Sequence, residues 1–202
     1  MKFTDPRIAY FDGLAARWDD EEPSAATMTA RLADHADLLG LTPGEALLEV
    51  GCGTGKTTAW LAARVAPGRV TAVDFAPEMI ARAAAKGIDA EFRCLDVCAD
   101  DLGTGQYDVI LCFHSFPHFR DQPAALRRVA RALRPGGRLI VMHLAGSEPL
   151  NRFHAGVDGP VSVDVLPGAE AWDPLLARAG LVQRTLIDRE DLFFLDARPA
   201  GG

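Results

Sequence analysis

Three acidic residues, Glu49, Asp74 and Asp96, stand at or near the ends of segments that read as β-strands. Carboxylates accept hydrogen bonds and attract cations, so three of them along one edge suit a ligand with ammonium, hydroxyl and amine groups. The same edge would repel a pyrophosphate. Ligands of open α/β sheets bind outside the carboxyl ends of the strands, which is where these side chains are expected.

A glycine-rich turn lies between a strand and a helix in LLEVGCGTGKTTAWLA, residues 47–62. The phosphate loop of nucleotide hydrolases requires a glycine where this chain has Val50. The dinucleotide fingerprint requires a third glycine where this chain has Lys56. Both patterns fail by one residue, so the turn predicts a different ligand.

Histidines gather near the ends of later strands. His114 and His118 follow the fourth strand, His143 ends the fifth, and His154 lies in the next segment. Three hypotheses stay open. In the first, His143 or His114 is a general base, because imidazole titrates near neutral pH. In the second, His114, His143 and His154 hold a divalent transition metal. In the third, these histidines only shape the pocket for a bound small molecule. His118 is interpreted as structural.

The order of the elements predicts how these residues are positioned. Strand and helix alternate from residue 46 onward, which predicts a Rossmann-like, doubly wound α/β fold with a mostly parallel seven-stranded sheet. Only three residues join the last two strands, so these must form an antiparallel hairpin. The expected strands are 46–50, 69–74, 90–96, 107–113, 138–144, 181–187 and 191–197, and the expected helices are 56–65, 77–86 and 122–134.

The chain is expected to form a single domain, 1–202, in which residues 1–44 are a helical cover. The first helical segment has one apolar stripe, formed by Ile8, Phe11, Ala15 and Trp18. The second has a face formed by Met28, Leu32, His35 and Leu39, so His35 is expected in a core or interface.

Residues 145–167 are rich in Gly, Pro and Asp, and they are expected to form an irregular acceptor-side lid or insert. Asn151, Arg152 and Asp164 are candidates for contact with the acceptor. A solvated loop without function is the alternative.

Composition excludes several classes of partner. The net charge of −7 and the scattered basic residues argue against nucleic acid, whose binding depends on neutralising phosphates. The first residues lack a secretory signal pattern, and no apolar run is long enough to span a membrane. The four cysteines, at 52, 94, 98 and 112, are expected to be buried, reduced thiols. We expect a cytoplasmic monomer or homodimer that acts on a small molecule.

Several segments together resemble the class I S-adenosylmethionine-dependent methyltransferases of the small ubiquinone-methylase-like type. LLEVGCGTG is similar to the first motif of that family, VTAVDFAPEMIARA to the second, and FRCLDV to the segment at the adenine edge. YDVILCFHSFPHFRD and LRPGGRLIVMH resemble the strands on the substrate side. The resemblance implies in-line methyl transfer from S-adenosylmethionine to a small-molecule acceptor.

The resemblance also implies roles for individual residues. Asp74 would accept hydrogen bonds from the ribose hydroxyls, Glu49 would order the glycine turn near the methionine ammonium, and Asp96 would meet the adenine amine. The remaining cofactor contacts that the resemblance implies are Tyr10, Trp18, Gly51, Gly53, Gly55, Phe75, Met79, Val97, Cys112 and Phe113. A purely structural role, capping the loop at a strand end, is the alternative for Asp74 and Asp96.

Two other functional classes stay open at this stage. One is an NAD(P)-dependent oxidoreductase, which the missing third glycine disfavours. The other is a non-catalytic S-adenosylmethionine-binding protein, against which the histidine-rich acceptor edge argues mildly.

Overall fold

A computed structural model describes residues 5–20 and 23–201. The chain forms two compact units, residues 1–95 and 96–202, which are described in turn. Within the described residues, three strands belong to the first unit and four to the second. The expected Rossmann-like fold, with seven mostly parallel strands and a C-terminal antiparallel hairpin, is confirmed.

The first unit contains three parallel strands, in the order β3-β2-β1. Strand β1 is Ala46–Val50, β2 is Arg69–Asp74 and β3 is Glu91–Cys94, and helices α4 (Thr58–Val65) and α5 (Pro77–Ala84) connect them. Every residue of β1 is buried, as expected for a strand covered on both faces. The register pairs Val50 with Val73, so β1 and β2 end at one edge.

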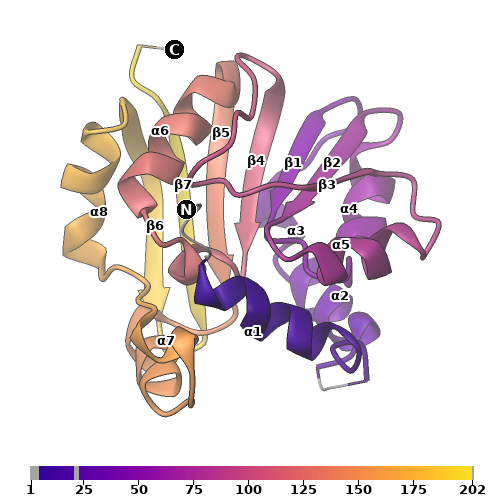
Figure 1. Ribbon diagram of the computed structural model, residues 1–202. Helices are drawn as coiled ribbons and strands as arrows, with labels where there is room; N and C mark the ends of the chain where they lie inside the picture. The colour runs from indigo at the N-terminus through magenta and orange to yellow at the C-terminus, as the bar shows by residue number, and fades with distance from the viewer. Residues whose placement is uncertain (1–4, 21–22, 202) are drawn as a thin grey trace. The chain divides into compact units, whose positions relative to one another are not determined.

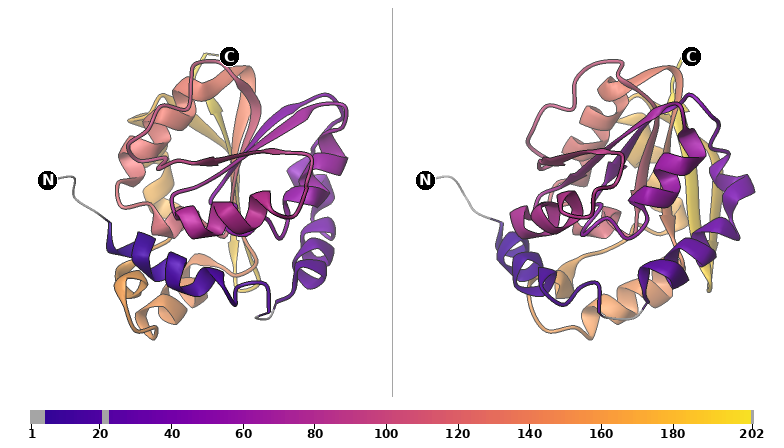
Figure 2. Two further views of the ribbon diagram at one scale, coloured as in Figure 1. Left: turned by 45° about the vertical axis from the view of Figure 1, so that its right-hand side comes forward. Right: turned by 90° about the vertical axis from the view of Figure 1, so that its right-hand side faces the viewer.

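Helix α1, Pro6–Ala15, lies alongside α5 in Figures 1 and 2. It begins where the Asp5 carboxylate accepts a hydrogen bond from the Arg7 N–H at 3.0 Å, with Pro6 as its first residue. These are common start signals of a helix. Trp18 lies beyond the last residue of α1, although the sequence placed it on the same helical stripe.

The second expected helix is divided into two. Helix α2 is Ala25–Ala33 and α3 is Ala36–Leu39. His35 lies between them with φ −112° and ψ 19°, outside the helical region, so Met28 and Leu39 do not share one continuous helix. Gly40 ends α3 in the left-handed conformation, which glycine adopts without steric cost.

The second unit contains four strands, in the order β4-β5-β7-β6. Strand β4 is Tyr107–Phe113, β5 is Leu133–His143, β6 is Leu181–Arg189 and β7 is Leu192–Pro199. The pair β4 and β5 is parallel, whereas β7 is antiparallel to both β5 and β6. Helices α6 (Gln122–Ala132) and α8 (Ala169–Ala177) pack on β5 and β6 respectively (Figure 1).

An aromatic group forms part of the buried core of the second unit. Trp172 on α8 packs against Phe116 at 4.9 Å and against Phe193 at 5.6 Å between ring centroids. The Trp172 indole N–H donates to the Pro167 carbonyl at 3.0 Å, which satisfies its one polar group. Phe116 lies on η1, a short 3₁₀ helix formed by Phe116–His118 that follows β4.

Residues 145–167 are not the irregular stretch that the composition predicted. They contain helix α7, Ser147–Ala155, and the 3₁₀ helix η2, Pro160–Val163, beyond the carboxyl end of β5 (Figure 1). The Ser147 N–H and hydroxyl donate to Asp188 at 2.8 and 2.5 Å, which anchors the first turn of α7. His154 therefore lies on a helix. Among the described residues, no helix has both the length and the apolar character that crossing a bilayer requires.

The prediction for the cysteines is correct for three of the four. All four thiols are free, and Cys52, Cys98 and Cys112 are buried, but Cys94 is exposed. Cys94 ends β3, a strand in which no residue is buried.

Candidate functional site

In the first unit, the glycine turn depends on backbone conformations that other residues rarely adopt. Gly51, Gly53 and Gly55 have φ angles of 76°, 54° and 79°. For L-residues with side chains this left-handed region is sterically unfavourable. The N–H groups of Gly51 and Cys52 both donate to the Val73 carbonyl, at 2.7 and 3.0 Å, so the turn is bonded to the end of β2.

Asp74 is the side chain that joins the turn to the next loop. Its Oδ2 accepts from the Gly53 N–H and its Oδ1 from the Ala76 N–H, each at 2.9 Å. Asp74 therefore caps the loop at the end of its strand, which was the alternative role considered for it. A carboxylate can accept hydrogen bonds at about four lone-pair positions, from hydroxyl as well as backbone N–H donors.

Glu49 lies beneath the turn and is 2% exposed. Its two oxygens accept from the hydroxyls of Thr57 and Thr58, at 2.8 and 2.6 Å, at the start of α4. Burial raises the pKa of Glu49 to about 7, against the two threonine hydrogen bonds, and the neighbouring charge of Asp74 adds to the increase. Glu49 thus fixes the turn to α4, and its charge responds to pH near neutrality.

The segment of the N-terminal cover between α1 and α2 contacts the glycine turn. The Thr54 hydroxyl donates to Asp19 at 2.5 Å, and the Lys56 ammonium donates to the Pro23 carbonyl at 3.0 Å. Trp18 lies under the same ammonium, 5.9 Å from ring centroid to Nζ. A Cβ on Gly53 would come within 3.6 Å of the Trp18 indole nitrogen. The cover is therefore bonded to the turn at several points.

The aromatic residues predicted to contact the cofactor each pack against Phe11, which was not part of that prediction. Phe11 contacts Tyr10, Phe75 and Trp18 at 5.3, 5.8 and 6.1 Å between ring centroids. Met79 is buried in the cluster beneath them, together with Ala15 and Ala76. The structure thus gives Met79 a packing role.

In the second unit, Asp96 is engaged by neighbours that the sequence did not indicate. Its Oδ1 accepts from the Cys98 N–H at 2.7 Å, and its Oδ2 accepts from Arg120 Nη2 at 2.6 Å and Nε at 3.2 Å. Val97, between them, is buried. Arg120 lies 24 positions away, in a loop with no periodic pattern, so no signal in the sequence connects the two.

The end of β4 leads into an unusual backbone position. Cys112 and Phe113 are buried, and burial raises the pKa of the Cys112 thiol well above its usual value. His114 follows with φ 54°, the only described residue other than glycine with a positive φ. Its Nε2 accepts from the Leu144 N–H at 3.3 Å, so in the neutral imidazole the proton is on Nδ1.

His143 packs edge-on against His114, with 5.1 Å between ring centroids, and it is 1% exposed. Neither ring nitrogen has a hydrogen-bond partner among the described residues. Burial lowers the pKa of His143 well below its usual value, and His114, His118 and His154 lower it further. His143 is therefore a neutral imidazole with both polar atoms unsatisfied.

A second histidine pair is organised by Asp164. His118 Nδ1 donates to Asp164 Oδ2 at 2.7 Å, and the His154 Nδ1–H donates to the Asp164 carbonyl at 3.0 Å. The rings of His118 and His154 lie 5.2 Å apart between centroids. The sequence analysis missed the link between His118 and Asp164, because 46 positions separate them and the intervening segment was expected to be irregular.

The hypothesis of a three-histidine metal site gains no support from this arrangement. His154 pairs with His118, whereas His114 pairs with His143. Within residues 5–20 and 23–201, no group of three His, Cys, Asp or Glu side chains is arranged to hold a metal ion.

Comparisons with known proteins add independent evidence. The model of a family described as "Methyltransferase domain" matches residues 48–141. The ubiquinone biosynthesis O-methyltransferase of Bordetella bronchiseptica is 30% identical over 181 residues, which cover 84% of this chain and 73% of that protein. The chain belongs to the class I S-adenosylmethionine-dependent methyltransferases. The expectation of an enzyme of this family is thereby confirmed.

Two further similar proteins differ in how much of their own length the match with this methyltransferase covers. The biotin biosynthesis bifunctional protein BioCD of Bordetella avium is 34% identical over 145 residues, 71% of this chain but only 31% of that protein. A solved structure of a DhpI–S-adenosylhomocysteine complex is 23% identical, with a TM-score of 0.76, and covers 98% of this chain and 97% of that one. At this identity the structure supports the fold of the methyltransferase.

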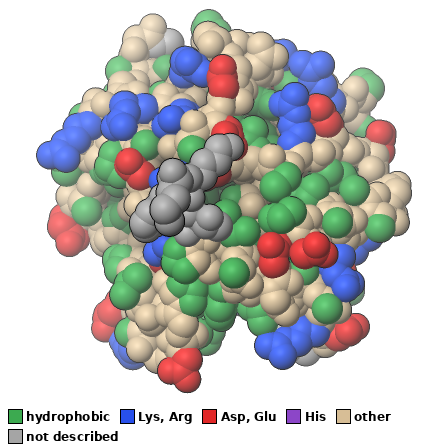
Figure 3. Space-filling view, viewed as in Figure 1, with side chains coloured by type: hydrophobic (Ala, Val, Ile, Leu, Met, Phe, Trp, Pro, Cys, Tyr) green, Lys and Arg blue, Asp and Glu red, His purple; other side chains and the backbone are tan. Residues whose placement is uncertain are grey.

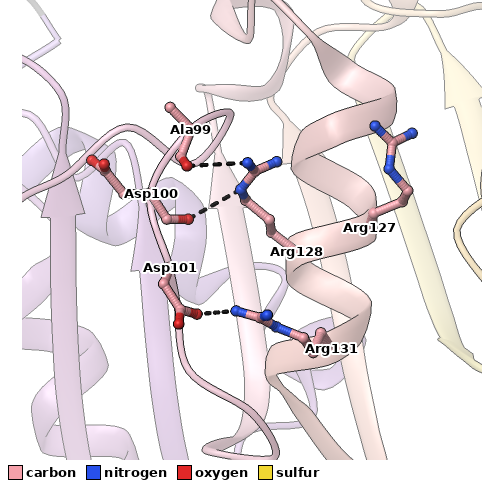
Figure 4. A pocket seen from close by; sticks show the side chains of 6 residues that line it. All are labelled: Ala99, Asp100, Asp101, Arg127, Arg128 and Arg131. Atoms are coloured by element: carbon pink, nitrogen blue, oxygen red, sulfur yellow. Dashed lines mark hydrogen bonds and ion pairs between the residues drawn. The ribbon is translucent and has the colours of Figure 1, made fainter.

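A pocket of about 390 Å³ in the second unit lies between α6 and the loop before β4 (Figure 4). Arg128 donates to the carbonyls of Ala99 and Asp100, at 3.0 and 3.1 Å, and Arg131 pairs with Asp101. These arginines thus hold the loop against α6. On the face of the methyltransferase in Figure 3, Lys and Arg lie in several separate groups with Asp and Glu among them.

Proposed function

We propose that this methyltransferase transfers the methyl group of S-adenosylmethionine to a hydroxyl oxygen of a small molecule. Membership of the family supports the donor. A relative that covers 84% of the chain is named as an O-methyltransferase of ubiquinone biosynthesis, which supports an oxygen acceptor. The chemistry is an in-line displacement, for which holding the two reactants in line supplies much of the acceleration.

The observation that carries the proposal is the Asp74 carboxylate bonded to the glycine turn. These two backbone hydrogen bonds fix the position of both oxygens, and the carboxylate accepts hydrogen bonds from the two ribose hydroxyls of the donor. Gly51, Gly53 and Gly55 supply the left-handed backbone conformations of the turn, and Glu49 sets the turn against α4. Tyr10, Trp18 and Phe75 contribute apolar surface from the same unit.

In the second unit, the proposal assigns four residues to the donor by their likeness to the family motifs. Asp96, held by Arg120, presents an acceptor to the adenine amine, and Val97 packs at the ring edge. Cys112 and Phe113 line the methionine arm at the carboxyl end of β4.

Calorimetric titration tests this assignment. Wild-type protein is expected to bind S-adenosylhomocysteine and not NADH. Asp74→Asn is expected to weaken S-adenosylhomocysteine binding at least tenfold, because hydrogen bonds to a charged group contribute about 1.5–3 kcal/mol each. Asp191→Asn, an exposed aspartate in the β6–β7 turn, is the matched control and should leave affinity unchanged. Binding of NADH, or unchanged affinity in Asp74→Asn, would overturn the proposal.

A further inference from the structure

A short strap, residues 16–20, follows α1 and lies against the glycine turn. Asp19 in this strap has both carboxylate oxygens engaged. Its Oδ1 accepts from the Thr54 hydroxyl at 2.5 Å, and its Oδ2 pairs with Lys86 Nζ at 2.7 Å. Thr54 belongs to the glycine turn and Lys86 follows the last residue of α5, so one carboxylate connects three segments of the first unit.

The surroundings of Asp19 keep it charged and give it one buried partner. Thr54 is fully buried, and its hydroxyl has Asp19 as its acceptor. The side chains of Asp19 and Lys86 are 40% and 31% exposed. Desolvation raises the pKa of Asp19, but the hydrogen bonds from Lys86 and Thr54 outweigh this effect, so the pKa lies below its ordinary value. Asp19 is therefore a carboxylate at neutral pH.

Burial contributes little to holding the strap. None of residues 16–20 is buried, and Ala15 is the one buried residue of α1. Trp18 packs, partly buried, against Ala15, Ala76 and Met79. Segments with few buried apolar contacts open locally at low cost. The packing of Trp18 and the two contacts of Asp19 therefore decide how readily the strap opens.

The strap reaches the part of the turn that the donor is proposed to contact. A Cβ on Gly53 would lie 3.6 Å from the Trp18 indole nitrogen, so the strap covers Gly53. The Gly53 N–H donates to Asp74, the carboxylate assigned to the ribose hydroxyls, and Thr54 is the next residue. The bond between Asp19 and Thr54 therefore acts one residue away from the bond between Gly53 and Asp74.

Resting on the proposed placement of S-adenosylmethionine at the glycine turn, we propose that Asp19 is a positioning residue that slows the release of the donor and of S-adenosylhomocysteine. Its bonds to Thr54 and Lys86 hold the strap against the turn, and the strap moves away before the ligand leaves. Asp19 acts through Thr54 and the strap, so it contributes to affinity and not to the methyl-transfer step. Because the pair with Lys86 is partly exposed, salt screens it, and the strap opens more readily as ionic strength rises.

Dissociation of S-adenosylhomocysteine from the full chain, measured by stopped-flow displacement, tests the proposal and needs no acceptor. Asp19→Asn should raise the dissociation rate constant about tenfold, which corresponds to a loss of about 1.4 kcal/mol. Asp20→Asn, the exposed neighbour in the same strap, is the matched control and should keep the wild-type rate.

Thr54 supplies a rescue by the conservative variant. Thr54→Val removes the hydroxyl at nearly the same volume, so it should raise the dissociation rate as Asp19→Asn does. Thr54→Ser keeps the hydroxyl and should stay near the wild-type rate. A side chain that only packs would not separate valine from serine in this way.

Ionic strength tests the ion pair in wild-type protein without a variant. The dissociation rate should rise between about 0.05 M and about 0.5 M sodium chloride, over which the screening length falls about threefold. Lys86→Gln should release S-adenosylhomocysteine faster at low salt and lose most of the salt dependence.

The outcomes separate the two proposals. Wild-type protein that binds no S-adenosylhomocysteine, or unchanged affinity in Asp74→Asn, would overturn the proposed placement of the donor, and the role of Asp19 with it. Where binding depends on Asp74, three results would each overturn the role of Asp19 alone. These are equal dissociation rates in Asp19→Asn and Asp20→Asn, equal rates in Thr54→Val and Thr54→Ser, and a wild-type rate that salt does not change.

Discussion

The Gly53 N–H donates to Asp74 Oδ2 at 2.9 Å across 21 positions of sequence, and the same carboxylate accepts from Ala76. One side chain thus fixes both the glycine turn after β1 and the loop after β2. Because the turn also needs three positive φ angles, its shape depends on backbone freedom and on this carboxylate together.

Gly53→Ala tests the first of these requirements. With φ 54°, an alanine would cost about 1–2 kcal/mol, while its Cβ would meet only the Trp18 indole at an ordinary 3.6 Å. We expect this loss of unfolding free energy in urea titrations, together with weaker binding of S-adenosylhomocysteine. Gly87→Ala is the matched control, since Gly87 has φ 65° and open space around it. It should lose similar stability and keep its affinity; equal affinity in the two variants would contradict the role of the turn.

Glu49 makes stability depend on pH in an unusual direction. Its pKa of about 7 in the folded chain lies above the ordinary 4.5, so between these values the folded chain holds a proton that the unfolded chain has released. The free energy of unfolding should therefore fall as pH rises through this window, by about 3 kcal/mol for this group. Urea titrations of wild type and Glu49→Gln at pH 5 and pH 8 measure the effect. Glu49→Gln should lose this part of the pH dependence. An equal change in unfolding free energy between pH 5 and pH 8 in both proteins would refute the role of Glu49.

The sequence predicted best where burial alone decides the structure. The ranges 46–50, 69–74 and 107–113 match β1, β2 and β4 to the residue, and almost every residue in these strands is buried. Strand β5 was expected from 138 but begins at Leu133, since Gly136 and Gly137 were interpreted as a turn before it. The register shift between Tyr107 and Val109 accommodates these extra residues.

Side-chain partnerships across long separations were not predictable. The periodicity of residues 145–167 is weak, so α7 and the placement of Asp164 on His118 had no signal in the sequence. For Asp96, the type and position were predicted, but its partner Arg120 was not. A sequence motif identifies the residue at a strand end. The side chains that contact this residue depend on how loops distant in the sequence fold.

Asn151 is expected to hold the end of the 145–167 segment. Its amide satisfies both backbone polar groups of Leu166, a residue that is fully buried, so Asn151→Ala leaves an N–H and a carbonyl without partners. The expected cost is about 1–3 kcal/mol for each such group, and some of it should appear as local opening. Hydrogen exchange of the amides at 164–166 should accelerate tenfold or more. The neighbouring Arg152→Ala, whose ion pair with Glu148 is exposed, should leave exchange unchanged; equal rates in both variants would contradict the expectation.

His143 is expected to reduce stability in the isolated enzyme. Both its ring nitrogens are buried without partners among the described residues, and an unsatisfied buried polar group costs about 1–3 kcal/mol. His143→Leu removes both polar atoms at similar volume, so we expect a higher free energy of unfolding in urea and a higher Tm. His118→Leu is the informative contrast: it should destabilise the enzyme, because it leaves the buried Asp164 carboxylate without the imidazole. A drop in stability for His143→Leu equal to that for His118→Leu would show that the His143 imidazole is satisfied in solution. If His143→Leu is more stable but less active, the unsatisfied imidazole is retained for the reaction at the cost of stability.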